Sequence, residues 1–264
     1  GGIGVASAIV EGLKRVGLDA EEAHSRVYVL DSKVLLLDDR GMDSYKQAFA
    51  HTRDSIKDWR FEGQAPNLLE VIENTSATVL LGLSGQTGTF NQPVVTAMSR
   101  NTANPMIFPL SNPTSASEAL PEDVLEWSEG RAIVATGSPF DDVVYEDNTY
   151  PIGQGNNAFI FPGLGLAAIL CEASEITDNM VLESAYALAE YTAAQHLASG
   201  LIYPPVDELQ EVSIRVASRV IHCALKEGVA GRTDLSEMDC DTFVRSRFWH
   251  PHYIPFVKGT LHSE

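Results

Sequence analysis

The sequence predicts an α/β fold built on a doubly wound, mostly parallel sheet with helices on both faces, followed by a helical C-terminal portion. Two observations predict it. Over the first part of the chain, four short apolar runs that end in Gly, Ser, Asn or Asp alternate with stretches of helical spacing. After Gly163, long stretches instead carry apolar residues three and four positions apart. Strand–helix–strand alternation is typical of parallel sheets, and the second pattern is typical of amphipathic helices.

The four apolar runs are the expected strands, because short apolar runs bounded by turn residues are typical of buried parallel strands. They span residues 27–31, 77–85, 105–113 and 131–139. The expected helices between and before them span 5–16, 67–75, 92–100 and 121–129, with one or two added helical turns in 18–26. The helix at 121 opens on Pro121 followed by Glu122 and Asp123, which is a typical helix start.

The C-terminal helices are expected at 167–174, 179–198 and 207–227, with Asp178 as the N-cap of the second. We therefore expect two parts. Residues 1–162 form the sheet-containing domain, and residues 163–264 form a helical portion packed on it.

Composition limits the classes of function. The formal net charge is −18, from 36 acidic and 18 basic residues, and such a chain repels a phosphate backbone, so nucleic acid is not an expected partner. Three scattered cysteines make neither a disulfide framework nor a CxxC metal site. No run of 18 apolar residues and no signal peptide is visible, so no membrane association is expected. We expect a cytoplasmic protein, although an organellar matrix stays open because a targeting segment could precede the first residue.

The chain opens on GGIGVASAIVEGL, in which small residues precede a helix. Backbone N–H groups and the helix dipole at such a start can meet a pyrophosphate. The run VYVLD ends on Asp31, and an acidic residue at the end of a second strand can bind an adenosine ribose. A plain tight turn would explain the glycines equally well if they stood alone. Together the two features predict a dinucleotide site in a Rossmann-type domain whose first strand is missing from the sequence.

Three further loops follow expected strands and carry candidate ligand contacts. GLSGQTG, with Ser84 and Gly85, is an open loop whose backbone can approach a flat ligand, or a plain strand-to-helix turn. In LSNPTS, Pro113 restricts the backbone of Asn112, which contacts a ligand or caps a turn. In YPIGQGNNAFIFPG, Asn156 and Asn157 can donate to a carboxylate, or form a polar turn between buried segments.

The sequence shows no pattern typical of hydrolases, metalloproteases or metal sites. The seven histidines show no ligand spacing, and Ser-His-Asp, HExxH, P-loop and paired-cysteine patterns are absent from the sequence. This excludes the common hydrolase and metalloprotease classes, and no metal site is expected in this chain.

With these motifs assembled, the sequence resembles malic enzymes over nearly its whole length. The matching words are LSNPTS, ATGSPF, YPIGQGNNAFIFPG, EITDN and GLIYPP. The resemblance implies oxidation of L-malate by NAD or NADP, followed by metal-assisted decarboxylation to pyruvate. It implies that Asn112 contacts cofactor and substrate, and that Asn156 and Asn157 hold malate near the nicotinamide. It also implies that Gly2 and Gly4 belong to the phosphate loop and that Asp31 reaches the ribose.

The resemblance also bears on cofactor choice. Family members that use NADP tend to have Ser after the strand-end Asp and a Lys before the FxH segment, which here are Ser32 and Lys46. Arg40 aligns with a family arginine near the adenosine. These residues favour NADP over NAD, because a lysine can pair with the 2′-phosphate. Asp31 favours NAD, because it would repel that phosphate.

The sequence also lacks the catalytic and metal-binding residues of the family. The resemblance places the lysine base, the tyrosine acid and the Mg or Mn ligands upstream of the glycine-rich loop, so no catalytic residue is expected in this chain. We expect the chain to need its own missing N-terminal domain for turnover and to form a homo-oligomer, by analogy. The alternatives are a catalytically silent dinucleotide-binding or assembly module and, less favoured, the cofactor domain of an amino-acid dehydrogenase.

Overall fold

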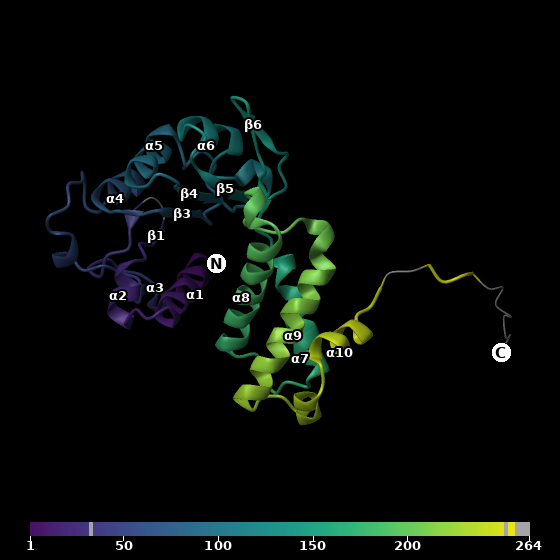
Figure 1. The fold of residues 1–264 in the computed structure, drawn as a ribbon. Coiled ribbons are helices and arrows are strands. Elements are labelled where there is room, and N and C mark those ends of the chain that lie inside the picture. The colour runs from purple at the N-terminus through teal and green to yellow at the C-terminus, as the bar shows by residue number, and fades with distance from the viewer. Residues whose placement is uncertain (32–33, 251–252, 257–264) are drawn as a thin grey trace, which may run out of the picture.

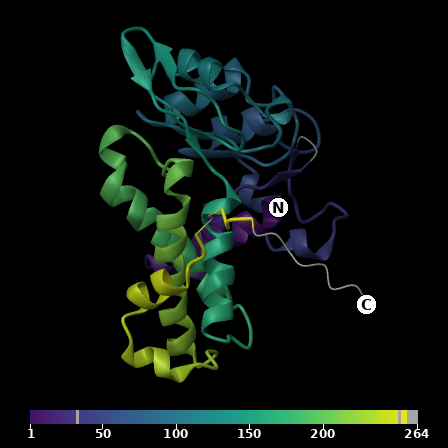
Figure 2. The same cartoon turned by 90° about the vertical axis from the view of Figure 1, so that its right-hand side faces the viewer.

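The computed structural model describes residues 1–31, 34–250 and 253–256. Its sheet and the helices around it form one part, and long helices from the second half of the chain form the other, as Figures 1 and 2 show. The strands are β1 Leu30–Asp31, β2 Val34–Leu35, β3 Val79–Gly82, β4 Met106–Pro109, β5 Ile133–Thr136, β6 Val143–Tyr145, β7 Asn148–Tyr150 and β8 Gly153–Gln154. Among the described residues, no helix is long and apolar enough to cross a membrane.

The helices of the first part are α1 Gly2–Arg15, α2 Ala20–Ser25, α3 Ser44–Gln47, α4 Leu68–Asn74, α5 Gln92–Asn101 and α6 Pro121–Trp127. Those of the second part are α7 Phe161–Leu170, α8 Asp178–Gln195, α9 Leu209–Glu227 and α10 Cys240–Arg247. The expected α/β class, with a parallel sheet flanked by helices and a helical C-terminal portion, is confirmed.

The central sheet is parallel and runs in the order β3-β4-β5-β8. Helices α4, α5 and α6 lie above it in Figure 1, and α1 lies below it. The strands β3 to β5 are shorter than the apolar runs that predicted them, because the polar residues at the end of each run form the loops. The strand β8 and the hairpin β6–β7 had no counterpart among the expected strands.

Apolar side chains from this sheet and from α5 and α6 form one core. Ile107 and Val95 have no exposed surface, and Val124 also has none, so strand and helix residues meet in a closed layer. Burial of a side chain of this size stabilises the fold by about 1.5–3 kcal/mol relative to exposure. Asn67 caps α4 in a capping box with Glu70, and Asn91 caps α5, so both helices begin where the sequence predicts.

The structure corrects the expected role of the first apolar run, residues 27–31. We expected residues 27–31 to form a parallel strand of the sheet, but Leu30–Asp31 pairs antiparallel with Val34–Leu35 in a separate two-stranded unit. The physical reason is a second apolar run, 34–37, only two residues further on. Two neighbouring runs can satisfy their backbone groups locally, and Leu35 and Leu37 bury their side chains completely against α4 and its surroundings.

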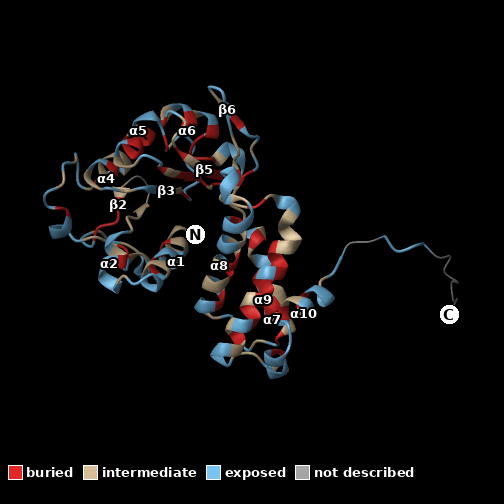
Figure 3. Cartoon of the chain, viewed as in Figure 1, coloured by how far each residue is buried: buried red, intermediate tan, exposed pale blue. Residues whose placement is uncertain are grey.

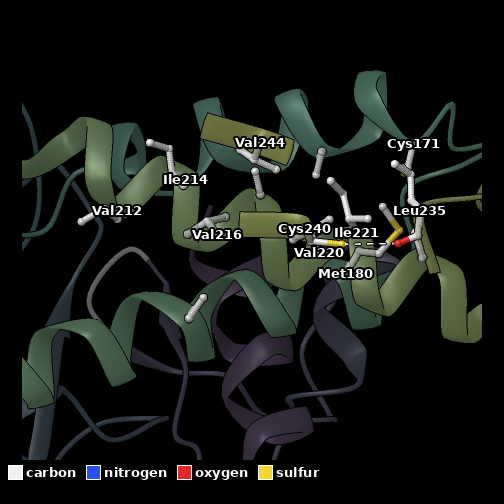
Figure 4. Packing of buried hydrophobic residues seen from close by; sticks show 14 of the residues in the cluster. Cys171, Met180, Val212, Ile214, Val216, Val220, Ile221, Leu235, Cys240 and Val244 are labelled. Carbon is white, nitrogen blue, oxygen red and sulfur yellow. Dashed lines mark hydrogen bonds between the residues drawn. The ribbon is translucent and has the colours of Figure 1, made fainter. Parts of the chain in front are cut away.

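The second part is organised around α9, whose residues Val216, Val220 and Ile221 have no exposed surface. Helix α9 packs against α7 and α8. Figure 3 shows buried residues along α9, and Figure 4 shows the side chains of this cluster. Two expected helix starts are corrected. Thr177, not Asp178, caps α8, and α7 begins six residues before residue 167 because Pro162 stands in its first turn, where no N–H is needed.

Candidate functional site

Four loops meet at one edge of the central sheet. Because β3, β4, β5 and β8 are parallel, their carboxyl ends lie on the same side, where open α/β sheets bind ligands. The loops after them carry Ser84, Asn112, Ser138 and Asn156, respectively. The structure therefore brings the predicted residues Ser84, Gly85, Asn112, Asn156 and Asn157 to one edge.

The loops after β3 and β4 are bonded to each other. The N–H of Gly85 donates to Ser111 Oγ at 2.8 Å, and the hydroxyl of Thr87 donates to the carbonyl of Ser115 at 2.6 Å. Beneath them lies Glu118, whose side chain is fully buried and accepts from Ser84 and Ser111. Sequence reasoning missed Glu118, because a single acidic residue after a loop carries no signal of burial.

Asn112 is held by the loop that follows β5. The hydroxyl of Ser138 donates to Asn112 Oδ1 at 2.6 Å. This leaves the amide nitrogen Nδ2 as the atom that can donate to a ligand. The loop of Ser138 comes close because Gly137 has no side chain: a Cβ there would lie 2.1 Å from the carbonyl oxygen of Leu110. The peptide bond between Asn112 and Pro113 is cis.

Asn156 and Asn157 lie at the end of β8. The side-chain oxygen Oδ1 of Asn156 accepts from the N–H of Ala158 at 2.9 Å and caps the short 3-10 helix Asn157–Phe159. Asn156 is half-buried and Asn157 is exposed. The turn that we considered as an alternative is therefore present, and it still leaves the amide nitrogen of Asn156 available as a donor.

The aromatic ring of Tyr203 lies behind this strand. A Cβ on Gly155 would stand 3.0 Å from Leu110 and 3.3 Å from the Tyr203 ring, so glycine lets β8 pack closely. Burial raises the pKa of the Tyr203 hydroxyl. Tyr203 belongs to the GLIYPP word of the sequence, whose spacing alone gave no reason to place it at the site.

A second group of predicted residues surrounds Asp31. Its carboxylate accepts from Lys46 Nζ at 2.9 Å and from Arg40 Nη2 at 3.0 Å. Burial acts to raise the pKa of Asp31, but the hydrogen bonds from Lys46 and Arg40 outweigh it and hold that pKa below its ordinary value. Ser32, the remaining predicted residue of this group, lies outside the described residues.

A cavity of about 370 Å³ lies beside this group, and Arg40 forms part of its wall. Arg53 also lines it and pairs with Asp39 through a 2.7 Å bond. The cavity is therefore bordered by two guanidinium groups. The sequence gave no indication of Arg53 or of this cavity.

Gly2 and Gly4 lie in the first turn of α1. No atom stands within 4 Å of a Cβ built on either glycine, so the helix start is open to a close approach. The first intrahelical bond runs from the N–H of Val5 to the carbonyl of Gly1, which leaves the N–H groups before Val5 without an acceptor in the helix.

The predicted residues thus form two groups, one at the sheet edge and one around Asp31, and Gly2 and Gly4 lie at the start of α1. Among the described residues, no hydrogen bond or ion pair joins the two groups. In the same part of the chain, no three His, Cys, Asp or Glu side chains are arranged to hold a metal ion.

Comparison with known proteins gives a consistent result. The family model described as malic enzyme, NAD binding domain, matches residues 1–225. The chain is 40% identical over 255 residues to an NAD-dependent malic enzyme of Vibrio parahaemolyticus, covering 96% of this chain and 45% of the relative. It is 38% identical over 261 residues to an NAD-dependent malic enzyme of Escherichia coli, covering 98% of this chain and 46% of the relative.

Solved structures agree in fold. A malic enzyme of Entamoeba histolytica superimposes with a TM-score of 0.64 at 27% identity, covering 83% of this chain and 41% of the other. A malic enzyme of Pyrococcus horikoshii has the same fold, with a TM-score of 0.58 at 24% identity, covering 83% of this chain and 44% of the other. The chain spans a little under half the length of the curated relatives that it matches.

Proposed function

Because this chain belongs to the malic enzyme family and matches its NAD-binding domain, we propose that it forms the dinucleotide-binding part of an enzyme that oxidises and decarboxylates L-malate. The observation that carries the proposal is the pair of amides at the sheet edge. Asn112 and Asn156 each have the side-chain oxygen bonded within the protein, so each presents an amide nitrogen as donor.

The residues present fit a dinucleotide at two places. Open glycines at the start of α1 leave backbone N–H groups and the positive end of the helix dipole free to hold a pyrophosphate. The carboxylate of Asp31 can accept hydrogen bonds from the adenosine ribose hydroxyls. The exposed loop with Ser84 and Gly85 would take part of the dinucleotide beyond the pyrophosphate.

The asparagines fit the substrate chemistry. A neutral amide donates to a carboxylate without adding a charge that changes with pH. We propose that Asn156 and Asn157 bind the malate carboxylate and that Asn112 lies between malate and the cofactor, where it orients both. NAD would accept the hydride from C2 of malate. The protein's part in that step is positioning, which lowers the entropic barrier when reacting atoms are held at near-contact distance.

The proton-transfer groups and the metal belong to the part of the enzyme that this chain does not match. The curated relatives are more than twice as long as the matched region. We propose that a lysine base, a tyrosine acid and the carboxylates for Mg²⁺ or Mn²⁺ lie there, so that this chain alone does not turn over malate.

The cofactor is proposed to be NAD. The pKa of Asp31 is held below its ordinary value, so its carboxylate carries a negative charge at neutral pH, and beside the adenosine ribose it would repel a 2′-phosphate. Lys46 and Arg40, which favoured NADP, both pair with Asp31 and are therefore partly neutralised. The relatives named above are NAD-dependent malic enzymes. Lys46, Arg40 and the neighbouring Arg53 keep NADP as the second candidate. The preference for NADP that the sequence suggested stays a prediction. Self-association and a cytoplasmic location also stay predictions.

Titration calorimetry of the chain with NAD, with wild-type protein and two variants, tests the proposal. We expect saturable NAD binding. Asn112→Ala should weaken it about tenfold, the equivalent of one hydrogen bond to a charged or strongly polar group. Asn148→Ala, an exposed asparagine in the β6–β7 hairpin, is the matched control and should bind like wild type. Wild-type protein that binds neither NAD nor NADP at millimolar concentration would reject the function.

A second measurement separates the enzyme from the silent module. Malate-dependent NADH formation is measured for the chain alone and after fusion behind the preceding segment of the Escherichia coli relative. Activity of the fusion that is lost in Asn156→Ala supports the enzyme. NAD binding by the chain with no activity of a folded fusion supports the silent binding or assembly module.

A further inference from the structure

We propose that the buried carboxylate of Glu118 is a positioning residue that holds the two loops of the dinucleotide site, those after β3 and β4, in their binding geometry. This inference rests on the proposed function, because it concerns the same site. It assigns a role to a residue that touches no ligand and acts from beneath the loops.

Glu118 receives four hydrogen bonds from the two loops. Its Oε1 accepts from the N–H of Ser84 at 2.9 Å, from the Ser84 hydroxyl at 3.0 Å and from the Ser111 hydroxyl at 2.6 Å. Its Oε2 accepts from the N–H of Ser111 at 3.3 Å. The side chain of Glu118 has no exposed surface, whereas Ser84 and Gly85 are exposed. One buried group thus bonds to the underside of both loops.

Both oxygens of the Glu118 side chain accept from backbone N–H groups. A carboxylate is acceptor-only on both oxygens, and all four partners donate to it. Among the described residues no Lys, Arg or His pairs with Glu118, so hydrogen bonds alone compensate for its burial. Hydrogen bonds to ionised groups are about twice as strong as neutral ones. A buried carboxylate with four donors is therefore a strong anchor, and an amide in its place would turn a donor toward a donor.

The sheet leaves space for this group. A Cβ on Gly82 would lie 2.5 Å from both Cδ and Oε2 of Glu118, closer than any real contact. Gly82 is the last residue of β3 and precedes the loop that Glu118 anchors. The glycine therefore has a packing role: it admits the carboxylate between the strand end and the two loops.

The loops need an anchor. Gly85 and Gly88 adopt positive φ values of 66° and 74°, so the loop after β3 contains two positions at which the backbone is conformationally permissive. Glu118 also reaches this loop through its own carbonyl, which accepts from the N–H of Phe90 at 3.1 Å. Through Ser111, the carboxylate is linked to Gly85, whose N–H donates to the Ser111 hydroxyl at 2.8 Å. Anchoring reduces the entropy that the loop must lose when a ligand binds.

Glu118→Gln is the direct test, with Glu122→Gln as its control. Glu122 lies nearby at the start of α6 and is exposed, so the control makes the same chemical change without touching the loops. NAD and AMP binding are measured by calorimetry, together with thermal unfolding and hydrogen exchange of peptides covering 82–90 and 110–118. AMP carries only the adenosine half, which the proposed function assigns to the Asp31 group.

We expect Glu118→Gln to weaken NAD binding at least tenfold, to change AMP binding less than twofold, and to speed amide exchange in the two loops while α9 stays protected. Equal loss of NAD and AMP binding, or unchanged NAD binding in a folded variant, overturns the inference. If wild-type protein binds no NAD, the proposed function fails instead.

Ser111→Ala covers the case in which Glu118→Gln does not fold. It removes one of the four donors and the acceptor of Gly85, but leaves the carboxylate in place. We expect an intermediate effect, about threefold to tenfold on NAD with AMP unchanged. NAD binding unchanged in Ser111→Ala, with normal exchange in the two loops, overturns the inference as well.

Discussion

Ser138 donates a 2.6 Å hydrogen bond from its hydroxyl to the amide oxygen of Asn112, and this bond joins the loops after β4 and β5. It determines which end of the Asn112 amide faces outward, because an amide whose oxygen is occupied presents its nitrogen. The hydroxyl can reach Asn112 only because Gly137 lets the two loops approach. The orientation of a proposed ligand contact therefore depends on two residues that need not touch the ligand.

Ser138→Ala tests this dependence. Loss of the hydroxyl frees the Asn112 amide to rotate, and we expect NAD binding to weaken about threefold to tenfold, the value of one ordinary hydrogen bond. Ser115→Ala is the control, because Ser115 contributes only its carbonyl to the loop contacts and should bind like wild type. Calorimetry measures both. If Ser138→Ala binds as wild type while Asn112→Ala is weakened, the hydroxyl does not orient the amide.

The charges around Asp31 give a prediction about cofactor choice. Asp31 pairs with Lys46 and Arg40, and its negative charge should exclude a 2′-phosphate. We expect wild-type protein to bind NAD at least tenfold more tightly than NADP. Asp31→Asn should weaken NAD and strengthen NADP, because the ribose loses an acceptor while the phosphate gains two unpaired cations.

Two further variants complete that experiment. Asp234→Asn makes the same chemical change at an exposed carboxylate that pairs with Arg232 in the helical part of the chain, and it should leave the ratio of the two affinities unchanged. Lys46→Gln should reduce NADP binding more than NAD binding. A wild-type preference for NADP would show that the sequence-based expectation is right and that the ion pairs with Asp31 open when the phosphate arrives.

Much of the fold was predictable because its signals are local. The cap residues Asn67 and Asn91 directly precede the helices that they cap, and the strands β3, β4 and β5 lie in continuous apolar runs. The two-stranded unit at Leu30–Asp31 was not predictable in the same way. A run that suits a buried strand does not say which partner it pairs with, and residues 34–37 provided a nearer one.

The site was predictable only in part. Asn112, Asn156 and Asn157 stand at strand ends, and parallel strands bring such ends together. Glu118 and Tyr203 could not be found, because their positions depend on burial and on contacts between residues far apart in the sequence, such as the one between Tyr203 and Gly155. The ion pair between Lys46 and Asp31 could not be predicted either, because it forms only when the folded chain brings the two residues together.

A pH-dependent contribution to stability is expected from Glu183. This carboxylate of α8 accepts from Arg15 of α1 at 2.6 Å and from Arg219 of α9 at 2.5 Å. Burial acts to raise the pKa of Glu183, but the bonds from Arg219 and Arg15 hold it below its ordinary value. A folded-state pKa below the unfolded one contributes stability above the unfolded pKa, and this stability is lost as pH falls through the folded pKa.

Glu183→Gln should therefore destabilise the chain by about 1–2 kcal/mol at neutral pH, with the difference from wild type shrinking below about pH 4.5. Urea unfolding at several pH values measures it. Glu11→Gln, which breaks an exposed pair with Lys14, should cost only about 0.3 kcal/mol and serves as the control. A constant difference between wild type and Glu183→Gln from pH 7 to pH 3 would contradict the role of its charge.

The thiol of Cys223 is expected to be unreactive. Burial and the charges of Glu227 and Glu183 raise its pKa to about 11 from an ordinary value of 9.0. At pH 8 its thiolate fraction is then about 100-fold lower than that of an ordinary cysteine, and the thiolate is the reacting form. Alkylation followed by mass spectrometry should show a rate that still rises tenfold per pH unit between pH 9 and 10. A plateau near pH 9 would show an ordinary pKa and would leave steric shielding as the only protection.

Two glycines of one helix give opposite predictions. In α7, a Cβ on Gly163 would lie 2.7 Å from the carbonyl oxygen of Ser213 and from Val216 Cβ, both on α9. Neither the helix backbone nor a β-branched residue can yield easily, so Gly163→Ala should force the two helices apart and destabilise the chain by about 1–3 kcal/mol. At Gly165 no atom stands within 4 Å of the added Cβ.

Gly165→Ala should therefore stabilise the chain by about 0.5–1 kcal/mol, because alanine loses less backbone entropy than glycine on entering a helix. The two variants share a helix and a chemical change and differ only in what the new methyl group meets, so each is the control for the other. Urea unfolding monitored by circular dichroism gives both free energies. If both substitutions stabilise the chain, the close contact between α7 and α9 at Gly163 is not what requires glycine there, and helix propensity alone would account for both results.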